Sequence, residues 1–442
     1  MIIRPERAAV LGIAALLGLA FALPLAAYWP GVMTWDAVRE YGMALRDPID
    51  DWHPPVMIWL WRQLLHVGLG PGPMLLLQLA LYVTGWGLVA RSAWASGSRW
   101  GALALAACSL FPIALVLEGA VLKDCLMAGA LLVALGLVAQ PRATLPDRLA
   151  ACVLLIFAAT LRYNAVFACL PLVIAALPAR WRATKVRLAS AVFGSAVILA
   201  SAAPVANRLI GARPSGVDYS QILFDLGGIT WFSGTDAFPP VAGVADPTLV
   251  NRSCYHPALW DSYAWWTDAP CPIGWNNVPA WFSARRKSPV AWWLSAIVHH
   301  PIAYVDHRMR HFAVNSGLVA AARPDPVLPP RPDANPYGFD IAPNLLRSKL
   351  QAAATAIHWS PFGRPISWIA ASAAILAVTR KRVSPLAGMA ASSSLLFGLS
   401  YAVISVASDL RYHLWTALGA LIALVGTLAA KRTVPAAPKN GG

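Results

Sequence analysis

The sequence predicts an all-α polytopic membrane protein with about ten transmembrane helices, and three observations support this prediction. The 442 residues are 58% hydrophobic and 12% charged, whereas a soluble domain carries about 25% charged residues. Several apolar stretches reach the roughly 20 residues that a helix needs to cross a bilayer. Many lysines and arginines stand in short connections between these stretches, which is typical of cytoplasmic loops. Because topology explains the net charge of +15, nucleic acid is not an expected partner.

The first apolar stretch follows Arg4 and Arg7, as in a signal peptide. It is longer than an ordinary signal sequence and ends at interfacial aromatic residues, so an uncleaved helix is expected. Placing the Arg/Lys connections in the cytoplasm puts both termini inside. The ten expected spans are 8–28, 73–91, 100–119, 125–140, 148–161, 164–178, 188–209, 365–379, 385–406 and 413–430.

This topology divides the chain into expected domains. An N-terminal transmembrane module covers 1–209, and its first outer loop (29–72) bears amphipathic helices. An extracytoplasmic loop domain over 210–363 precedes the last three helices, which lie within 364–432. A disordered tail is expected over 433–442.

The segment from Pro55 to Leu69 is too short and too polar to be an eleventh span. It carries Arg62 and His66. A crossing here would also place a basic loop outside, whereas basic loops usually lie in the cytoplasm. The segment is therefore expected to lie at the outer interface as an amphipathic helix.

The six cysteines fall into two groups. Four lie in apolar spans and are expected to be small core residues. Cys254 and Cys271 lie in the long polar segment, and a disulfide between them is expected if that segment is extracytoplasmic. The spacing of cysteine and histidine gives no sign of a zinc site.

Charged motifs collect on the outer side of this topology. Charge beside hydrocarbon costs roughly 2.5–3.5 kcal/mol per residue, so such groups usually mark a functional site. The pattern predicts an active site at one membrane face. The motifs are Asp36, Asp50-Asp51-Trp52-His53-Pro54-Pro55, Lys123-Asp124, Arg162-Tyr163-Asn164 and Ser408-Asp409-Leu410-Arg411-Tyr412.

Asp36 and His53 are the candidate catalytic residues. A carboxylate beside aromatic rings just outside the membrane can be a general base or can ligate a cation. It can equally cap a helix that starts at Ala37. His53 precedes two prolines, which fix it in an extended conformation. It either points into a cleft or stands before an ordinary helix N-terminus, and the residues alone leave both alternatives open.

Lys123, Arg162 and Arg411 occupy comparable outer turns. Lysine meets phosphate as a point charge and guanidinium groups match its oxygens bidentately, so three such cations on one face predict an anionic ligand. The alternative is that Lys123 pairs with its neighbour Asp124 and that the arginines are snorkelling residues.

Three patterns in the long segment carry weaker predictions. His307 and His311 are four residues apart, as in a metal pair, but without a third ligand a solvated helix face is expected. Asp225-Leu226-Gly227-Gly228 is expected to be a helix end with a glycine cap. Asn251-Arg252-Ser253 fits the glycosylation sequon.

These motifs resemble the GT-C superfamily of membrane glycosyltransferases, including its protein-O-mannosyltransferase-like and aminoarabinose-transferase-like branches. The resemblance covers nearly the whole chain in layout and short motifs in residue detail. The acidic residue of the first outer loop falls on Asp36, and Asp51-Trp52-His53-Pro54-Pro55 is similar to a His-Pro-Pro segment of many bacterial members. Lys123-Asp124 resembles a Lys-Asp pair at the outer end of a later helix, and Asp409-Leu410-Arg411-Tyr412 resembles an Arg-Tyr turn.

The resemblance implies an enzyme of the bacterial inner membrane that works on the extracytoplasmic face. It would transfer a hexosyl or pentosyl group, with inversion, from a polyprenyl-phosphate donor to a glycan, lipid or protein acceptor. Asp36 would be the general base, and His53 would assist. A divalent cation stays open as a cofactor, and membrane lipids are expected partners. The implied substrate-binding residues are Asp51, Trp52, Lys123, Asp124, Arg162, Tyr163, Arg411 and Tyr412.

Three other classes of protein compete with this interpretation. A transporter or flippase of lipid-linked saccharides needs no general base, but usually shows repeated halves and polar residues at mid-bilayer. A polysaccharide polymerase or ligase would depend on arginine more than on Asp36. A non-catalytic assembly factor would explain the tryptophan-rich segment within 210–363 but not the clustered charges.

Overall fold

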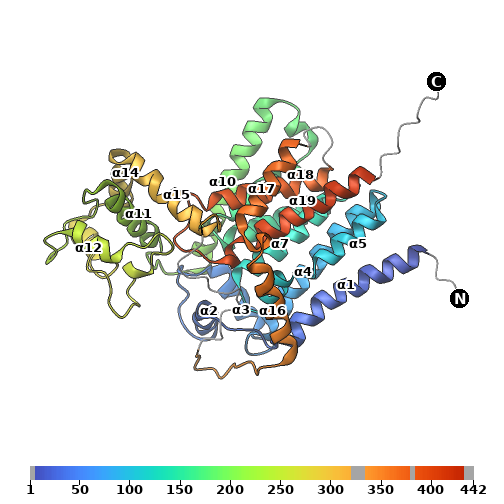
Figure 1. Cartoon of the computed structure of the whole chain (residues 1–442), viewed down its shortest axis with the longest axis horizontal. Coiled ribbons are helices and arrows are strands. Elements are labelled where there is room, and N and C mark those ends of the chain that lie inside the picture. The colour runs from blue at the N-terminus through green and yellow to red at the C-terminus, as the bar shows by residue number, and fades with distance from the viewer. Residues whose placement is uncertain (1–4, 320–333, 379–383, 433–442) are drawn as a thin grey trace. The chain divides into compact units, whose positions relative to one another are not determined.

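The computed structural model describes residues 5–319, 334–378 and 384–432, and their regular structure is helical apart from three isolated β-bridges (Figure 1). The predicted all-α class is confirmed. The tail over 433–442 lies outside the described residues.

The chain forms two compact units. Unit 1 comprises Met1–Arg213, Asp325–Gly398 and Arg411–Gly442, and unit 2 comprises Pro214–Pro324 and Leu399–Leu410. Residues 334–363, which were expected in the loop domain, group with the helices of unit 1.

Unit 1 holds the helices that coincide with expected spans together with several shorter ones, and α18 and η4 extend into unit 2 at one end. They are α1 (Pro5–Tyr28), α2 (Trp35–Leu45), α3 (Pro55–Leu64), α4 (Gly72–Ala95), α5 (Arg99–Cys108), α6 (Pro112–Leu117), α7 (Lys123–Val138), α8 (Leu145–Leu161), α9 (Ala165–Ala176), η1 (Ala179–Arg182), α10 (Lys185–Ile210), α16 (Leu345–His358), η3 (Pro361–Gly363), α17 (Pro365–Val378), α18 (Pro385–Ser400), η4 (Leu410–His413) and α19 (Leu414–Arg432).

Among the residues that the structure describes, four helical stretches are long and apolar enough to cross a membrane by themselves, and three shorter helices are strongly apolar. The long stretches are Glu6–Tyr28, Gly72–Ala95, Lys185–Ile210 and Leu410–Ala430, and the shorter helices are Ala165–Ala176, Pro365–Val378 and Pro385–Ser400. The chain is an integral membrane protein.

The expected span over 100–119 is not one helix. It is divided into α5 and α6, because Pro112 occupies the first turn of α6 and its ring keeps the preceding Phe111 out of the helical region. Phe111 accordingly has φ −59° and ψ 115°.

Glycines bring α4 and α7 into close contact at the centre of unit 1. A Cβ on Gly85 would lie 2.4 Å from the Cβ of Leu132, and a Cβ on Gly136 would lie 2.5 Å from the Cβ of Leu88. Small residues at a helix contact let two backbones approach closely, as in membrane helix pairs. α4 also packs against α1 and α5, while α19 packs against α5, α7 and α17 (Figure 1). This packing fixes the axis of α7, which starts at Lys123.

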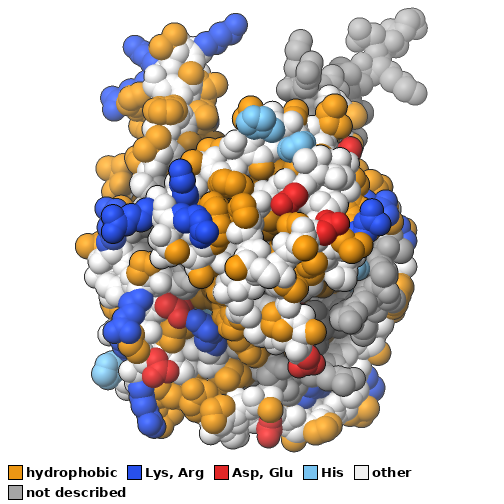
Figure 2. All heavy atoms as spheres, turned by 90° about the vertical axis from the view of Figure 1, so that its left-hand side faces the viewer, with side chains coloured by type: hydrophobic (Ala, Val, Ile, Leu, Met, Phe, Trp, Pro, Cys, Tyr) orange, Lys and Arg blue, Asp and Glu red, His pale blue; other side chains and the backbone are white. Residues whose placement is uncertain are grey.

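The outer surface of α10 is largely apolar. Val186, Phe193 and Leu209 are more than 70% exposed. Hydrophobic side chains also occur among the charged ones over the face that Figure 2 shows. Exposed apolar side chains along a helix of this length are expected where the helix contacts lipid rather than water.

Unit 2 is a group of shorter helices. They are α11 (Asp218–Ser233), α12 (Pro247–Cys254), η2 (Asp261–Tyr263), α13 (Val278–Arg285), α14 (Pro289–His299) and α15 (Pro301–Asn315). The expected disulfide between Cys254 and Cys271 is present.

Replacing both Cys254 and Cys271 by serine is expected to destabilise unit 2. The bond joins residues 17 positions apart, and closing a loop of about 15 residues removes roughly 3 kcal/mol of unfolded-chain entropy. Limited proteolysis across a temperature series would show cleavage within 214–324 starting at a lower temperature. The matched control is Cys152→Ser, which removes a thiol outside the disulfide. Identical cleavage curves for the double variant and the control would contradict the prediction.

Two expectations for this unit were wrong. His307 and His311 do not lie on a solvated helix face, because both are fully buried against the ring of Phe224. The Asp225-Leu226-Gly227-Gly228 run is not a helix end either. It lies inside α11, where a Cβ on Gly228 would be 2.1 Å from the His307 ring. The glycine is needed for close packing of α11 on α15.

A polar network explains how unit 2 buries these groups. Asp225 accepts hydrogen bonds from Trp293 Nε1 (2.8 Å) and Gln221 Nε2 (3.0 Å), lies 3.1 Å from His307 Nε2 and pairs with Arg308. Asp225, His307 and Arg308 thus have polar or charged partners, which offsets the cost of removing them from water.

The sequon asparagine is also part of the core of unit 2. Asn251 is buried, donates to the carbonyl of Gly227 at 2.9 Å and accepts from Tyr263 at 2.5 Å. With both ends of its amide engaged, Asn251 is not presented as a glycosylation acceptor.

Candidate active site

Asp36 lies in the first turn of α2, and Thr34 caps that helix. The Thr34 side chain accepts a hydrogen bond from the backbone N–H of Ala37 at 3.4 Å, which is the usual role of an N-cap threonine. The interpretation of Asp36 as the helix cap is therefore wrong. Its carboxylate is available for other partners.

Two cations from distant parts of the chain meet this carboxylate. Arg411 Nη2 lies 3.1 Å from Asp36 Oδ2, and Lys123 Nζ lies 3.8 Å from the same oxygen. All three side chains are at most 23% exposed. Burial opposes ionisation of Asp36, but the charges of Arg411 and Lys123 outweigh it and hold the pKa of this carboxyl well below its usual range.

Lys123 also contacts His53. The distance from Lys123 Nζ to His53 Nδ1 is 3.1 Å. Burial, followed by the charge of Lys123, lowers the pKa of His53, so the imidazole is neutral at physiological pH. A neutral ring can accept a hydrogen bond from the lysine ammonium group at Nδ1. The residue before the two prolines thus orients the lysine that faces Asp36.

Glu40 lies beside His53, one helical turn after Asp36. Its Oε1 is 3.7 Å from His53 Nδ1, and its side chain is 2% exposed. Burial raises the pKa of Glu40 to about 8. Glu40 is therefore uncharged at neutral pH, so it does not compete with Asp36 for the nearby cations.

Arg162 and Asp124 form another ion pair beside Asp36, Lys123 and Arg411. The guanidinium of Arg162 also lies over the ring of Tyr412, 4.2 Å from its centre, in a cation–π contact. The alternative that Lys123 pairs with its neighbour Asp124 is wrong, since the two side chains have different partners. Together, the three ion pairs place three cations and two carboxylates in one cluster.

A short backbone contact holds the first outer loop against the start of α7. Val32 and Ala120 form a parallel β-bridge, with Val32 N donating to Gly119 O at 3.0 Å and Val121 N to Val32 O at 3.1 Å. The buried amide of Gln78 donates to the carbonyls of Glu118 and Ala120. These bonds bring Asp36, four residues after Val32, to Lys123.

The other residues predicted for the site, Asp51, Trp52 and Tyr163, are sequence neighbours of residues in the cluster. The backbone N–H of Asp51 donates to the carbonyl of Arg213 at 3.1 Å, and that of Trp52 donates to Asp50 Oδ1 at 3.0 Å. The ring of Tyr163 is 58% exposed. α3 begins at Pro55, directly after His53-Pro54, as the diproline predicted.

The cluster offers no good position for a divalent cation. Asp36 already shares its charge with two cations, which leaves it little attraction for a third. Within the described ranges, no three His, Cys, Asp or Glu side chains come together as metal ligands would.

Sequence reasoning missed the buried position of Glu40 and the anchoring role of Gln78. The four-residue spacing from Asp36 to Glu40 places both on one helix face, so this signal was present. Gln78 lies within an apolar span, and nothing around it in the sequence indicates its partners.

Comparison with known proteins gives one structural likeness. No protein-family model and no curated protein sequence matches the chain. Among solved structures, the crystal structure of ArnT from Cupriavidus metallidurans bound to undecaprenyl phosphate is similar to 97% of this chain and 79% of that chain. The identity is 15% and the TM-score is 0.36. At these values, a function has to be argued from the side chains of the cluster.

Proposed function

We propose that the chain is a membrane glycosyltransferase that moves a sugar from a polyprenyl-phosphate donor to an acceptor hydroxyl. One observation carries the proposal: Asp36 is held by Lys123 and Arg411 at the ends of helices in a membrane protein. A carboxylate supplies a base for a hydroxyl, and two adjacent cations supply a site for a lipid phosphate. The motif resemblance to GT-C enzymes supports the same reaction.

In this mechanism the acceptor oxygen attacks the anomeric carbon as the bond from that carbon to the phosphate oxygen breaks. The electron pair of the broken bond leaves with the lipid phosphate, and the configuration at the sugar carbon inverts. Asp36 takes the proton of the attacking hydroxyl. Arg411 and Lys123 stabilise the charge on the departing phosphate, with Arg162 next to them.

Donor binding would also prepare the base. In the cluster as it stands, Arg411 and Lys123 make Asp36 a weak base because they stabilise its ionised form. A phosphate between the two cations would draw their charge away from Asp36 and raise its pKa. The carboxylate therefore becomes more basic when a donor is present, which limits proton uptake from water in the empty enzyme.

The proposed location is the inner membrane of a bacterium, with the cluster on the extracytoplasmic side and both termini in the cytoplasm. The Cys254–Cys271 disulfide supports an oxidising environment for unit 2. The basic loops between helices support a cytoplasmic location for the opposite ends of the spans.

The direct test is transfer of radiolabelled sugar by the purified full-length protein from a panel of polyprenyl-phosphate donors. Label that moves to an acceptor or to water supports the transferase. Donor binding without any turnover across the panel would instead favour a transporter of lipid-linked saccharides. Such a result would contradict the proposed function.

The wild type is expected to lose affinity for the sugar donor at alkaline pH, and Glu40→Gln is expected to abolish this loss. Glu40 is neutral below its pKa of about 8. As the pH rises through that value, its new negative charge faces Lys123 and Arg411 and, with Asp36 and Asp124, weakens their attraction for phosphate. The KM for donor should therefore rise above about pH 8 in the wild type and stay flat in Glu40→Gln. The same alkaline rise in both proteins would contradict this role of Glu40.

A further inference from the structure

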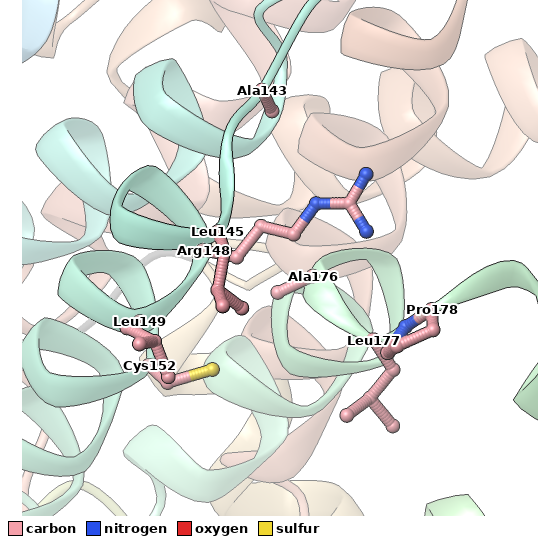
Figure 3. Close-up of a pocket in the computed structure, with 8 residues that line it drawn as sticks. All are labelled: Ala143, Leu145, Arg148, Leu149, Cys152, Ala176, Leu177 and Pro178. Atoms are coloured by element: carbon pink, nitrogen blue, oxygen red, sulfur yellow. The ribbon is translucent and has the colours of Figure 1, made fainter.

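A groove with a nearly apolar lining lies between the start of α8 and the end of α9 in unit 1. Its volume is about 210 Å³. Figure 3 shows Leu145, Leu149 and Cys152 on one side and Ala176 with Pro178 on the other. None of its lining residues belongs to the cluster around Asp36.

Arg148 is the one charged residue in this lining. Its side chain extends from α8 toward the side of Ala176 and Pro178 (Figure 3). The guanidinium has no ion pair or side-chain hydrogen bond to any residue in the described part of the chain. The neighbouring acid, Asp147, is engaged by the N–H and hydroxyl of Thr144 at 2.8 and 2.7 Å.

The chain that follows the groove adds positive charge. η1 starts one residue after Pro178, and all side chains from 179 to 190 are exposed. The exposed basic residues are Arg180, Arg182, Lys185 and Arg187. Their charges and that of Arg148 create a positive surface beside the groove.

An exposed apolar stripe continues from the groove along α8. Leu145, Leu149 and Val153 are spaced four residues apart and are 58–68% exposed, and Ile156 extends the row. Residues at this spacing share one helix face. Since α8 coincides with an expected membrane span, this face suits an acyl chain.

We propose that the groove binds an anionic membrane phospholipid. The phosphate lies on Arg148, with the basic residues of η1 and α10 around the head group, and one acyl chain follows the Leu145–Val153 stripe. An unpaired guanidinium matches the charge and the geometry of a phosphate. A zwitterionic lipid would fit the apolar stripe but gain less from the surrounding charge. This site is separate from the proposed transferase centre.

The test is native mass spectrometry of the full-length protein from micelles with equal amounts of phosphatidylglycerol and phosphatidylcholine. The wild type should retain phosphatidylglycerol preferentially. Arg148→Glu should lower the ratio of retained phosphatidylglycerol to phosphatidylcholine by at least about fivefold, since one basic residue near an anionic surface contributes that much. Arg148→Gln, a milder change, should lower it in the same direction.

The matched control is Arg7→Glu, the same charge change at an exposed arginine of α1. It should leave the ratio unchanged. Three outcomes would overturn the proposal. The first is an unaltered ratio in both Arg148 variants. The second is an equal fall of the ratio in Arg7→Glu, which would indicate diffuse surface charge. The third is displacement of the retained phospholipid by a polyprenyl phosphate.

Discussion

Asp36→Asn is expected to reduce sugar transfer by roughly 10²–10⁴-fold, the contribution of a positioned general base. The substitution keeps the size of the side chain and its hydrogen-bonding oxygen but removes the basic group. Because Lys123 and Arg411 then lose the carboxylate that competes for them, donor affinity should stay the same or increase. Single-turnover transfer and equilibrium donor binding, measured on the same preparation, separate the two effects.

Asp50→Asn is the control for this experiment. Asp50 lies in the same outer loop and is also paired with an arginine, 2.6 Å from Arg39 Nη2, but it is not part of the Asp36 cluster. A partly exposed ion pair of this kind contributes about 1 kcal/mol or less, so transfer should change little. Full activity of Asp36→Asn would remove Asp36 from the mechanism. A loss of donor binding in that variant would instead assign it to the binding site.

Arg411→Gln is expected to reduce kcat/KM for the sugar donor by roughly 10²–10³-fold. Loss of one preorganised hydrogen-bond donor to a developing negative charge has an effect of this size. Arg411→Lys should recover only part of this, because lysine keeps the charge but not the bidentate geometry. Titrating the donor at saturating acceptor measures the effect. Arg39→Gln, which also removes an arginine paired with an acid of this loop, is the control.

The double variant Asp36→Asn/Arg411→Gln tests whether the pair acts as a unit. Residues in direct contact show interaction energies, so the combined loss should be smaller than the product of the two single losses. Independent effects that multiply would contradict the joint role of the 3.1 Å pair.

The fold class and several members of the cluster could be predicted because charge beside a hydrophobic span is visible in sequence. Asp36, Lys123 and Arg411 were found this way. Their pairing could not be predicted. Lys123 and Asp124 are neighbours in sequence, but successive residues on a helix diverge by about 100°, so each has a separate partner. Such partners depend on how helices pack, which local sequence does not specify.

The prediction of a solvated helix face for the histidines of α15 failed for a related reason. His307 and His311 lie four residues apart among polar neighbours, which is also the pattern of a solvated face. Their burial depends on Phe224 and Asp225, which are more than 80 residues earlier in the chain. A polar helix face is buried when another element supplies enough hydrogen bonds, and no window of local sequence contains that information.

The contact between Asp36 and Arg411 has a consequence for biosynthesis. Asp36 leaves the ribosome well before the arginine that pairs with it, because the helices from α3 to α18 lie between the two residues in the chain. The β-bridge between Val32 and Ala120 can form much earlier, so the nascent chain holds a carboxylate and one lysine long before the second cation arrives. A chain that stops short of Arg411 would carry the whole first outer loop and still lack this ion pair. Completion of the centre therefore requires translation at least as far as η4, which carries Arg411.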